Sequence, residues 1–337
     1  MLICFIKTAV IVIKRILVVA LATGAFVQIA VAQTIIKDDA TTAQKPIEEV
    51  EDLAARTRIS GTAVTEQGLL SLKGKKNLDY ALLAGLDDVR DLILDGSDIV
   101  DLTPLGAMRG VEMISLNGTN VADITPLLRI ESLRHIYLND TQVTDLSPLS
   151  KMIWLEDIGL DFTLVEDLTP LKNLRQLRRL SIQATLVSDL SPLKNLTRLV
   201  WLNVSDSLVS DISVVSKFPE MHELTLAGTL VEDISSLANL KAMKILHLEG
   251  TYVSDLTPLA DLDRLVELNL GLTAIEDISP LAGLENLRFL DLSVTNVHDV
   301  SPLADLKKMR EVRLQGTAVE DVSALDELTQ KGLKLDF

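Results

Sequence analysis

The sequence predicts an α/β solenoid with a parallel β-sheet on its concave face and 3₁₀ or other short helical turns on its convex face. The first observation is a period of 22 residues, which an aspartate marks from Asp101 to Asp321 without insertion or deletion. The second is that apolar residues keep constant places in each period. Segment 133–149 shows this most clearly, reading Leu-x-x-Ile-x-Leu-x-x-Thr-x-Val-x-Asp-Leu-x-Pro-Leu. A period in the twenties built on leucine is typical of a solenoid. It is too short for a strand, its turns and a full α-helix, so short helical turns are expected.

The N-terminal segment has the features of a secretory signal. A basic pair, Lys14-Arg15, precedes an apolar run that ends in Ala30-Val31-Ala32. This order predicts a signal peptide over 1–32, cleaved after Ala32, and a periplasmic or extracellular protein. The alternative is an uncleaved anchor, and only then would the chain contact a membrane. The single cysteine, Cys4, lies in this segment, so a disulfide or a thiolate metal site is not expected.

The remaining chain divides by its agreement with the period. Residues 33–46 are polar and predict a flexible lead-in. Residues 47–88 predict a diverged N-terminal cap: 47–55 suit a short helix, 58–64 look like a degenerate repeat, and Asp79 is in phase with Asp101. Residues 89–325 form the array, and 326–337 its C-terminal cap. Caps are needed because the end coils would otherwise expose an apolar layer.

Each period should contain one strand, one corner and one short turn. In 133–154, Ile136 and Leu138 should point inward from the strand, and Thr141 should satisfy backbone groups of the adjacent turn. Ser147 is expected to cap the helical turn, with Pro148 in its first position. Leu149 and a following apolar residue, Ile153 or Leu155, should pack over the strand.

The aspartate row has a structural and a metal-binding interpretation. We expect each carboxylate to accept backbone N–H bonds in its own turn. The alternative is a calcium-binding row, supported by Glu166, Glu232, Glu276 and Glu320, but the sequence has no dense calcium loop. No metal site and no cofactor are therefore predicted. The row comprises Asp101, Asp123, Asp145, Asp167, Asp189, Asp211, Asp233, Asp255, Asp277, Asp299 and Asp321.

The repeat resembles that of the bacterial internalins, which are leucine-rich repeat proteins with a 22-residue period. The motif Asp-Leu-[Ser/Thr]-Pro-Leu carries the resemblance and recurs from Asp101 onward, so that 89–325 is covered. In that family the repeats form a curved horseshoe with a parallel sheet on the concave face, which binds host surface proteins. The resemblance implies the leucine-rich repeat fold and a concave binding face. Threonine replaces the family's usual asparagine in the inner row, and we do not carry over the host partner.

The composition and motifs favour binding over catalysis. The formal net charge is −16, which argues against nucleic acid as a partner. No catalytic motif of the common hydrolases or nucleotide-binding enzymes occurs, so no enzymatic activity is predicted.

Variable positions of the strands should form the open face of the sheet, in three columns that begin at Asp91, Ile93 and Asp95. Aromatic and basic residues in these columns are candidate binding anchors, although the same residues could simply be tolerated on a surface. We expect the hot spot at His135, Tyr137, Arg179 and Trp201, and place Trp154 at the sheet corner as a packing residue. The candidate residues are His135, Tyr137, Arg179, Trp201, His247, Phe289 and Arg313.

These observations predict an exported, monomeric, non-enzymatic module that binds a protein partner through its concave face. The first alternative is a structural or adhesive envelope protein whose aspartate row is assisted by calcium. The second is a carbohydrate-binding module that uses the exposed aromatic residues.

Overall fold

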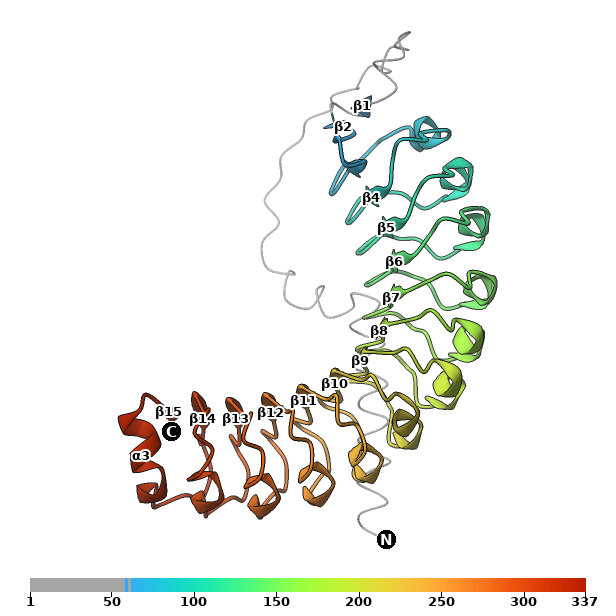
Figure 1. Cartoon of the computed structure of the whole chain (residues 1–337). Helices are drawn as coiled ribbons and strands as arrows, with labels where there is room; N and C mark the ends of the chain where they lie inside the picture. The colour runs from blue at the N-terminus through green and yellow to red at the C-terminus, as the bar shows by residue number, and fades with distance from the viewer. Residues whose placement is uncertain (1–57, 60–61) are drawn as a thin grey trace, which may run out of the picture.

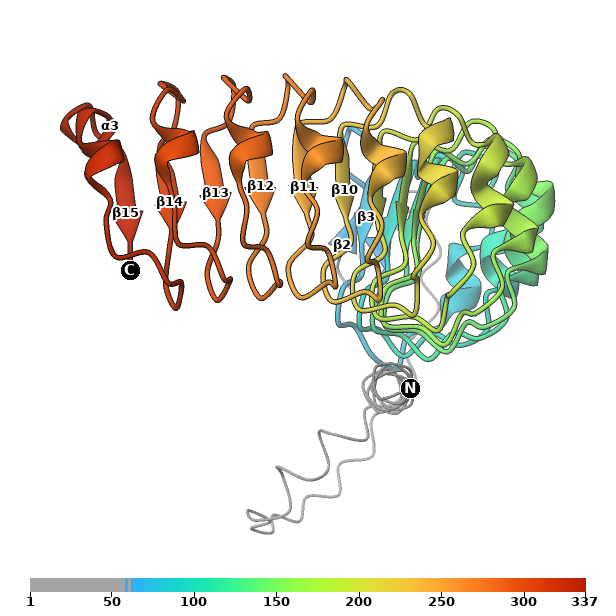
Figure 2. The ribbon, with the colours of Figure 1, turned by 90° about the horizontal axis from the view of Figure 1, so that it is seen from below.

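The computed structural model describes residues 58–59 and 62–337, and these form one curved solenoid (Figure 1). The predicted signal peptide, the lead-in and the first part of the N-terminal cap lie outside the described residues. The coils stack side by side, with strands along the inner face and short helical turns along the outer face (Figures 1 and 2). The predicted leucine-rich repeat solenoid is therefore confirmed.

A parallel sheet of 13 strands lines the concave face, and its strands follow the order of the chain. Each strand pairs with the next at a spacing of one period, so Ile136 lies between Ile114 and Ile158. The strands are β3 (Leu69–Ser71), β4 (Asp91–Ile93), β5 (Met113–Ser115), β6 (His135–Tyr137), β7 (Asp157–Gly159), β8 (Arg179–Ser181), β9 (Trp201–Asn203), β10 (Glu223–Thr225), β11 (Ile245–His247), β12 (Glu267–Asn269), β13 (Phe289–Asp291), β14 (Glu311–Arg313) and β15 (Lys334–Asp336).

The convex face consists of 3₁₀ helices, as predicted, and they fall into two groups. From η2 to η7 the helices have five residues, and from η8 to η12 they have three. They are η1 (Tyr80–Leu83), η2 (Thr103–Ala107), η3 (Thr125–Arg129), η4 (Ser147–Lys151), η5 (Thr169–Asn173), η6 (Ser191–Asn195), η7 (Ser213–Lys217), η8 (Ser235–Leu237), η9 (Thr257–Leu259), η10 (Ser279–Leu281), η11 (Ser301–Leu303) and η12 (Ser323–Leu325).

The core is an aliphatic column that continues from coil to coil. Ile136, Leu138, Leu149 and Leu155 are fully buried, whereas Ile153 is 47% exposed. Of the two residues expected to pack over the strand, Leu155 therefore does so. Each coil buries its own layer against its two neighbours, which lets a solenoid lengthen without a larger central core.

The threonine row closes each coil from within. Thr141 is buried, and its hydroxyl donates to the carbonyl oxygen of Leu138 at 2.7 Å. The acceptor lies in the same coil, three residues back, and not in the adjacent turn as expected. This geometry repeats along the row, and it satisfies a buried hydroxyl and a strand-end carbonyl together.

The ends of the array differ from the predicted caps. The sheet already begins at β3, inside the segment predicted as the cap, with Leu70 and Leu72 fully buried. The degenerate repeat predicted over 58–64 is wrong, because β1 (Arg58–Ile59) turns back and pairs antiparallel with β2 (Thr62–Ala63). At the C-terminus, α3 (Asp326–Gln330) leads into β15, which continues the parallel sheet.

Candidate functional site

From β3 to β14, the first and third residues of each strand lie on the open side of the sheet and the middle one is buried. In β6, His135 and Tyr137 are half-buried while Ile136 is fully buried. The neighbouring strands keep the same register, although their third residues, Ser115, Gly159 and Ser181, are small and buried. The first two columns predicted from the sequence therefore form the open face.

Four neighbouring strands bring part of the predicted set together. Strands β6 to β9 place His135, Asp157, Arg179 and Trp201 in one row. The Nδ1 atom of His135 lies 2.9 Å from Oδ2 of Asp157, and Cζ of Arg179 lies 5.1 Å from the centre of the Trp201 ring. The second distance is a cation–π contact. We call His135, Tyr137, Arg179 and Trp201, with Asp157, the aromatic cluster.

Tyr137 fits into a space that a glycine leaves open on the next strand. A Cβ atom at Gly159 would lie 3.1 Å from Cδ1 of Tyr137. Burial raises the pKa of the Tyr137 hydroxyl, Asp157 raises it further, and Arg179 lowers it. At neutral pH the hydroxyl therefore keeps its proton, and Asp157 is its acceptor within the aromatic cluster.

The other three predicted residues lie further along the sheet and form no single site with the aromatic cluster. Nε2 of His247 lies 3.1 Å from Oε1 of Glu267. The Nε atom of Arg313 donates to Glu311 at 2.9 Å, so that guanidinium is already partly neutralised. Phe289 is 42% exposed. His135 and His247 stand on β6 and β11, five strands apart, which excludes a shared metal ion.

The third predicted column forms a hydrogen-bond row that sequence reasoning missed. Oδ1 of Asn117 accepts from the N–H of Asn139, and Oδ1 of Asn139 accepts from the N–H of Asp161 at 2.8 Å. Asp161 in turn accepts from the N–H of Gln183. Runs of Asn and Asp one period apart were the available signal. These side chains join successive coils and are not free for a partner.

Trp154 does not have the predicted packing role. Its side chain is 52% exposed, and Cζ of Arg134 lies 5.8 Å from the ring centre. The adjoining Leu155 fills the core in its place. Trp154 is thus an exposed aromatic residue, whereas the sequence predicted a packing residue at the sheet corner.

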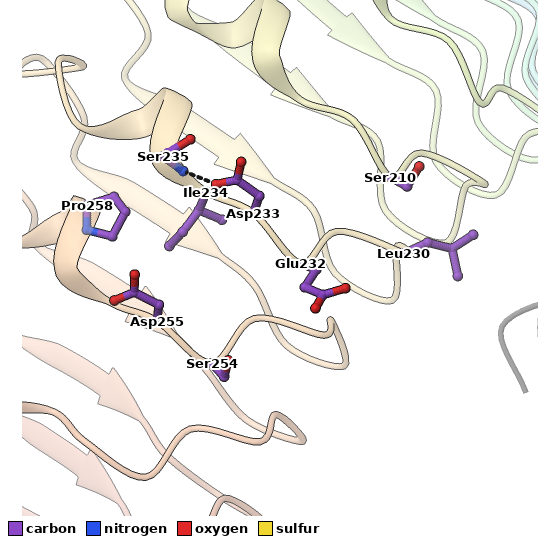
Figure 3. A pocket seen from close by; sticks show the side chains of 9 residues that line it. All are labelled: Ser210, Leu230, Glu232, Asp233, Ile234, Ser235, Ser254, Asp255 and Pro258. Carbon is purple, nitrogen blue, oxygen red and sulfur yellow. Dashed lines mark hydrogen bonds between the residues drawn. The ribbon is translucent and has the colours of Figure 1, made fainter. Parts of the chain in front are cut away.

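The aspartate row runs along the corner between the sheet and the 3₁₀ helices. Oδ1 of Asp145 accepts from the N–H of Ser147 at 2.8 Å, and Oδ2 accepts from the Ser147 hydroxyl at 2.8 Å. Figure 3 shows the equivalent bond from Ser235 to Asp233, with Asp255 of the next coil nearby. All eleven aspartates of the period accept the same backbone bond, at 2.7 to 2.9 Å.

This geometry changes one detail of the predicted turn. Helix η4 begins at Ser147, so the serine is its first residue and not its cap. The cap hydrogen bond comes from Asp145, two residues earlier, and Pro148 follows as the second helical residue. The backbone bond expected for the aspartate is present, whereas the cap expected from Ser147 is not.

Hydrogen bonding lowers the pKa of most of these carboxyls. For Asp211, Asp233, Asp277, Asp299 and Asp321 the first cause of the lowered pKa is the backbone N–H of the serine two residues on. For Asp101, Asp123, Asp167 and Asp255 the side chain of the threonine two residues on comes first, followed by its N–H. These nine carboxylates therefore remain ionised near neutral pH.

Two features of the described residues concern the calcium-binding and membrane-anchor alternatives. Between 62 and 337, no three or more histidine, cysteine, aspartate or glutamate side chains come close enough together to bind a metal ion. An open hollow of about 490 Å³ lies beside Asp233 and Asp255 of the aspartate row (Figure 3). Its described lining residues include no such metal-binding group. Within the same part of the chain, every helix is too short or too polar to span a membrane.

Comparisons with known proteins identify the fold. No family model matches the sequence, and no curated protein matches it. Among solved structures, an internalin (inlF) of Listeria monocytogenes is 25% identical, with a TM-score of 0.72, 80% of this chain covered and 86% of the internalin. A leucine-rich repeat protein of Leptospira interrogans is 16% identical, with a TM-score of 0.65, 76% of this chain covered and 74% of the other.

A third similar structure is a plant peptide hormone receptor solved in complex with its peptide. It is 14% identical, with a TM-score of 0.62, and the match covers 82% of this chain and 52% of the receptor. The TM-score of 0.72 over 80% of this chain shows that the internalin shares the solenoid fold described above. The chain is an internalin-like leucine-rich repeat protein.

Proposed function

We propose that this chain is an exported, non-enzymatic interaction module that binds a protein partner through its concave face. The observation that carries the proposal is the aromatic cluster on β6 to β9. It places a phenol, an indole and a guanidinium on neighbouring strands of an exposed sheet. Tyrosine, tryptophan and arginine are the residues most enriched among binding hot spots.

The energetics of the aromatic cluster support this use. The middle residues of these strands, Ile158, Leu180 and Leu202, form the core, whereas the cluster residues lie outside it. Arg179 and Trp201 contact one another instead of the interior, so the pair holds a preformed, partly apolar surface. Preformed side chains lose less conformational entropy when a partner binds.

Export and the monomeric state belong to the same proposal. Export rests on the basic pair and apolar run before Ala32, and N-terminal sequencing of the mature protein would test it. A start at Gln33 is expected, whereas an intact N-terminus on the isolated protein would contradict cleavage. The monomeric state rests on the large negative charge, which repels copies of the chain from one another.

The binding test compares two double variants of the full chain. Tyr137→Ala with Trp201→Ala should reduce capture of a partner from envelope extract at least tenfold, with an unchanged unfolding midpoint. Glu223→Ala with Ile245→Ala, on the open face of β10 and β11, is the matched control and should retain capture. Undiminished capture by the first variant would place the site elsewhere. Loss of binding to a glycan array instead of a protein would favour the carbohydrate alternative.

A further inference from the structure

A second surface stands apart from the aromatic cluster, on β12 to β14. Three large apolar side chains are exposed there within two consecutive coils: Leu272 is 63% exposed, Phe289 42% and Val294 53%. Leu272 and Val294 occupy the same place in successive coils, where the N–H of Leu272 donates to the Ser293 carbonyl at 2.8 Å. We call Leu272, Phe289 and Val294 the apolar patch.

Two of these residues adopt a backbone conformation that their side chains disfavour. Leu272 has a φ of 58° and Val294 a φ of 57°. The equivalent residues are Gly228, Gly250 and Gly316 in nearby coils, which adopt positive φ without strain, and Asp140, Phe162, Ala184 and Asp206 in earlier coils. A β-branched residue in this region is an outlier. Because both side chains are more than half exposed, the interior of the coil gains little from them.

The surroundings of Phe289 are hollowed and acidic. A hollow of about 250 Å³ opens on the concave side between β12 and β14, and Glu267, Asp291 and Glu311 line it. Arg313 also lines it, but its guanidinium lies 2.9 Å from Glu311 and 3.4 Å from Asp291. Three carboxylates against one cation leave the hollow negative, next to exposed hydrocarbon.

We propose that β12 to β14 bind an extended polypeptide segment in which apolar and basic residues alternate on one face. Phe289, Asp291 and Val294 follow one another along a single coil and present apolar, acidic and apolar groups in turn. Along an extended chain, every second side chain points the same way at about 7 Å spacing. A partner of the pattern apolar-x-basic-x-apolar therefore places its basic residue over the acidic hollow, with its apolar residues over Phe289 and Val294. Asp291 itself is held by the Ser293 N–H and Arg313, so Glu267 and Glu311 supply the more exposed carboxylates.

Charge favours a basic polypeptide segment over two other candidate occupants, a second copy of the chain and an anionic lipid surface. A second copy of the chain carries the same net charge of −16, and an anionic lipid surface is negative as well, so both are repelled. A basic segment is attracted, and complementary charge both steers the encounter and fixes the orientation. The proposal concerns other strands than the aromatic cluster and goes beyond the function proposed above.

The test uses the full chain and a defined probe, the fluorescein-labelled heptapeptide Leu-Ser-Lys-Ser-Leu-Ser-Lys, followed by fluorescence anisotropy. Saturable binding that weakens with added salt is expected. Two control peptides, one with glutamate for both lysines and one with serine for both leucines, should bind at least tenfold more weakly. Equal binding of the acidic peptide, or no saturable binding of the basic one, would overturn the proposal.

Two variants then locate the site. Leu272→Asn with Val294→Asn should weaken peptide binding at least tenfold and leave the urea midpoint unchanged or higher, because asparagine tolerates positive φ. Phe289→Ser should also weaken peptide binding, and it leaves the positive-φ positions 272 and 294 unaltered. Tyr137→Ala with Trp201→Ala should bind the peptide as the unaltered chain does, which separates this proposal from the previous one.

Other results would contradict the assignment. A fall in the urea midpoint of the Leu272 and Val294 double variant would mean that these side chains serve their own coil. A concentration-dependent dimer in sedimentation that the double variant abolishes would assign the patch to a second copy. Flotation with anionic vesicles, lost in the same variant, would assign it to a membrane.

Discussion

The coils of β4 to β9 and those of β10 to β14 repeat the same sequence motif, yet the side-chain hydrogen bonds on their open faces differ. In the first half, Asn117, Asn139 and Asp161 accept backbone bonds from the next coil. In the second half the third column contains no Asn or Asp. Asn269 and Asp291 of the second column accept from an N–H two residues ahead in their own coil, as Asn203 does in the first half. The solenoid axis also turns between β9 and β11 (Figure 1). Backbone pairing therefore joins all the coils, and the first half adds side-chain bonds between them.

The open face differs between the halves in the same way. The first half carries the aromatic cluster, with Arg179 against Trp201. The second half alternates acidic and apolar residues in its first column: Glu223, Ile245, Glu267, Phe289 and Glu311. A uniform scaffold thus offers two surfaces of different chemistry, and each can be altered without touching the core.

The largest expected effect comes from filling the space beside Tyr137. In Gly159→Ala the new Cβ would lie 2.9 Å from Oδ1 of Asn139 and 3.1 Å from Tyr137. Both the inter-coil bond and the aromatic cluster must then shift, at a cost of about 2–3 kcal/mol in urea unfolding. Gly271→Ala in the second half is the control, since its nearest contacts are 3.4 Å. Equal costs at the two sites would contradict the difference between the halves.

A smaller effect should follow from removing one inter-coil acceptor. Asn139→Ala leaves the N–H of Asp161 without its partner and should cost about 1–2 kcal/mol. It should also speed amide hydrogen exchange at Asp161, in the next coil. For Asn269→Ala, the faster exchange should stay at Gly271, within its own coil. Exchange that changes locally in both variants would show that the first half is no more interlocked than the second.

The aspartate row makes the same hydrogen bond in both halves, so substitutions in it should change stability equally in the two halves. Asp167→Ala removes an acceptor for the N–H of Thr169 and should cost about 1 kcal/mol in urea unfolding. Asp277→Ala should move the urea midpoint by the same amount. The asparagine variants, which keep an acceptor oxygen, should move it less. A gain in stability on substitution would mean that repulsion along the row outweighs capping.

The smallest effect concerns pH and one glutamate of the second half. Burial raises the pKa of Glu249, and its Oε2 is buried without a hydrogen-bond partner. An acid with a raised folded pKa destabilises the fold above that pKa, and this cost disappears below the unfolded value of about 4.3. Glu249→Gln should therefore raise the urea midpoint slightly at pH 7 and leave it unchanged at pH 4. A fall at pH 7 would show that the carboxylate is stabilised in place.

The aspartate row contributes to the pH dependence of stability with the opposite sign to Glu249. Hydrogen bonds lower the pKa of residues such as Asp211 and Asp299, so their contribution is complete above the unfolded value of about 3.9. It is lost as the pH falls below 3.9 toward the lowered folded values. Acid unfolding of the unaltered chain should therefore begin below about pH 4, as circular dichroism would show. Unfolding that begins near pH 6 would contradict this sign.

The period predicted the coils because nothing interrupts it between Asp101 and Asp321. Buried positions such as Ile136 and Leu149 followed from it directly, because one residue of shift would expose them. The ends of the array were harder to predict from the sequence. The β1–β2 hairpin has residues that fit a repeat, but its backbone closes within six residues instead of wrapping a coil.

The polar details were beyond the pattern for a physical reason. Asn139 stands in the third column and Asn269 in the second, so the amide oxygen accepts from an N–H of the next coil in the first case and of its own coil in the second. Trp154 was predicted to pack at the sheet corner because it lies just before the strand, but Leu155 fills the core there and Trp154 is 52% exposed. The candidate site was therefore predicted as a set of positions, whereas its division into two surfaces required the structure.

The aspartate row makes the solenoid a line of fixed charge. One carboxylate recurs per coil, the strands of successive coils lie about 4.8 Å apart in the sheet, and at 0.1 M salt the field of each charge reaches about 10 Å. The fields of neighbouring carboxylates therefore overlap along the corner and favour mobile cations there. Every coil added to such a chain extends this line by one charge, so the length of the array and the length of its negative field increase together.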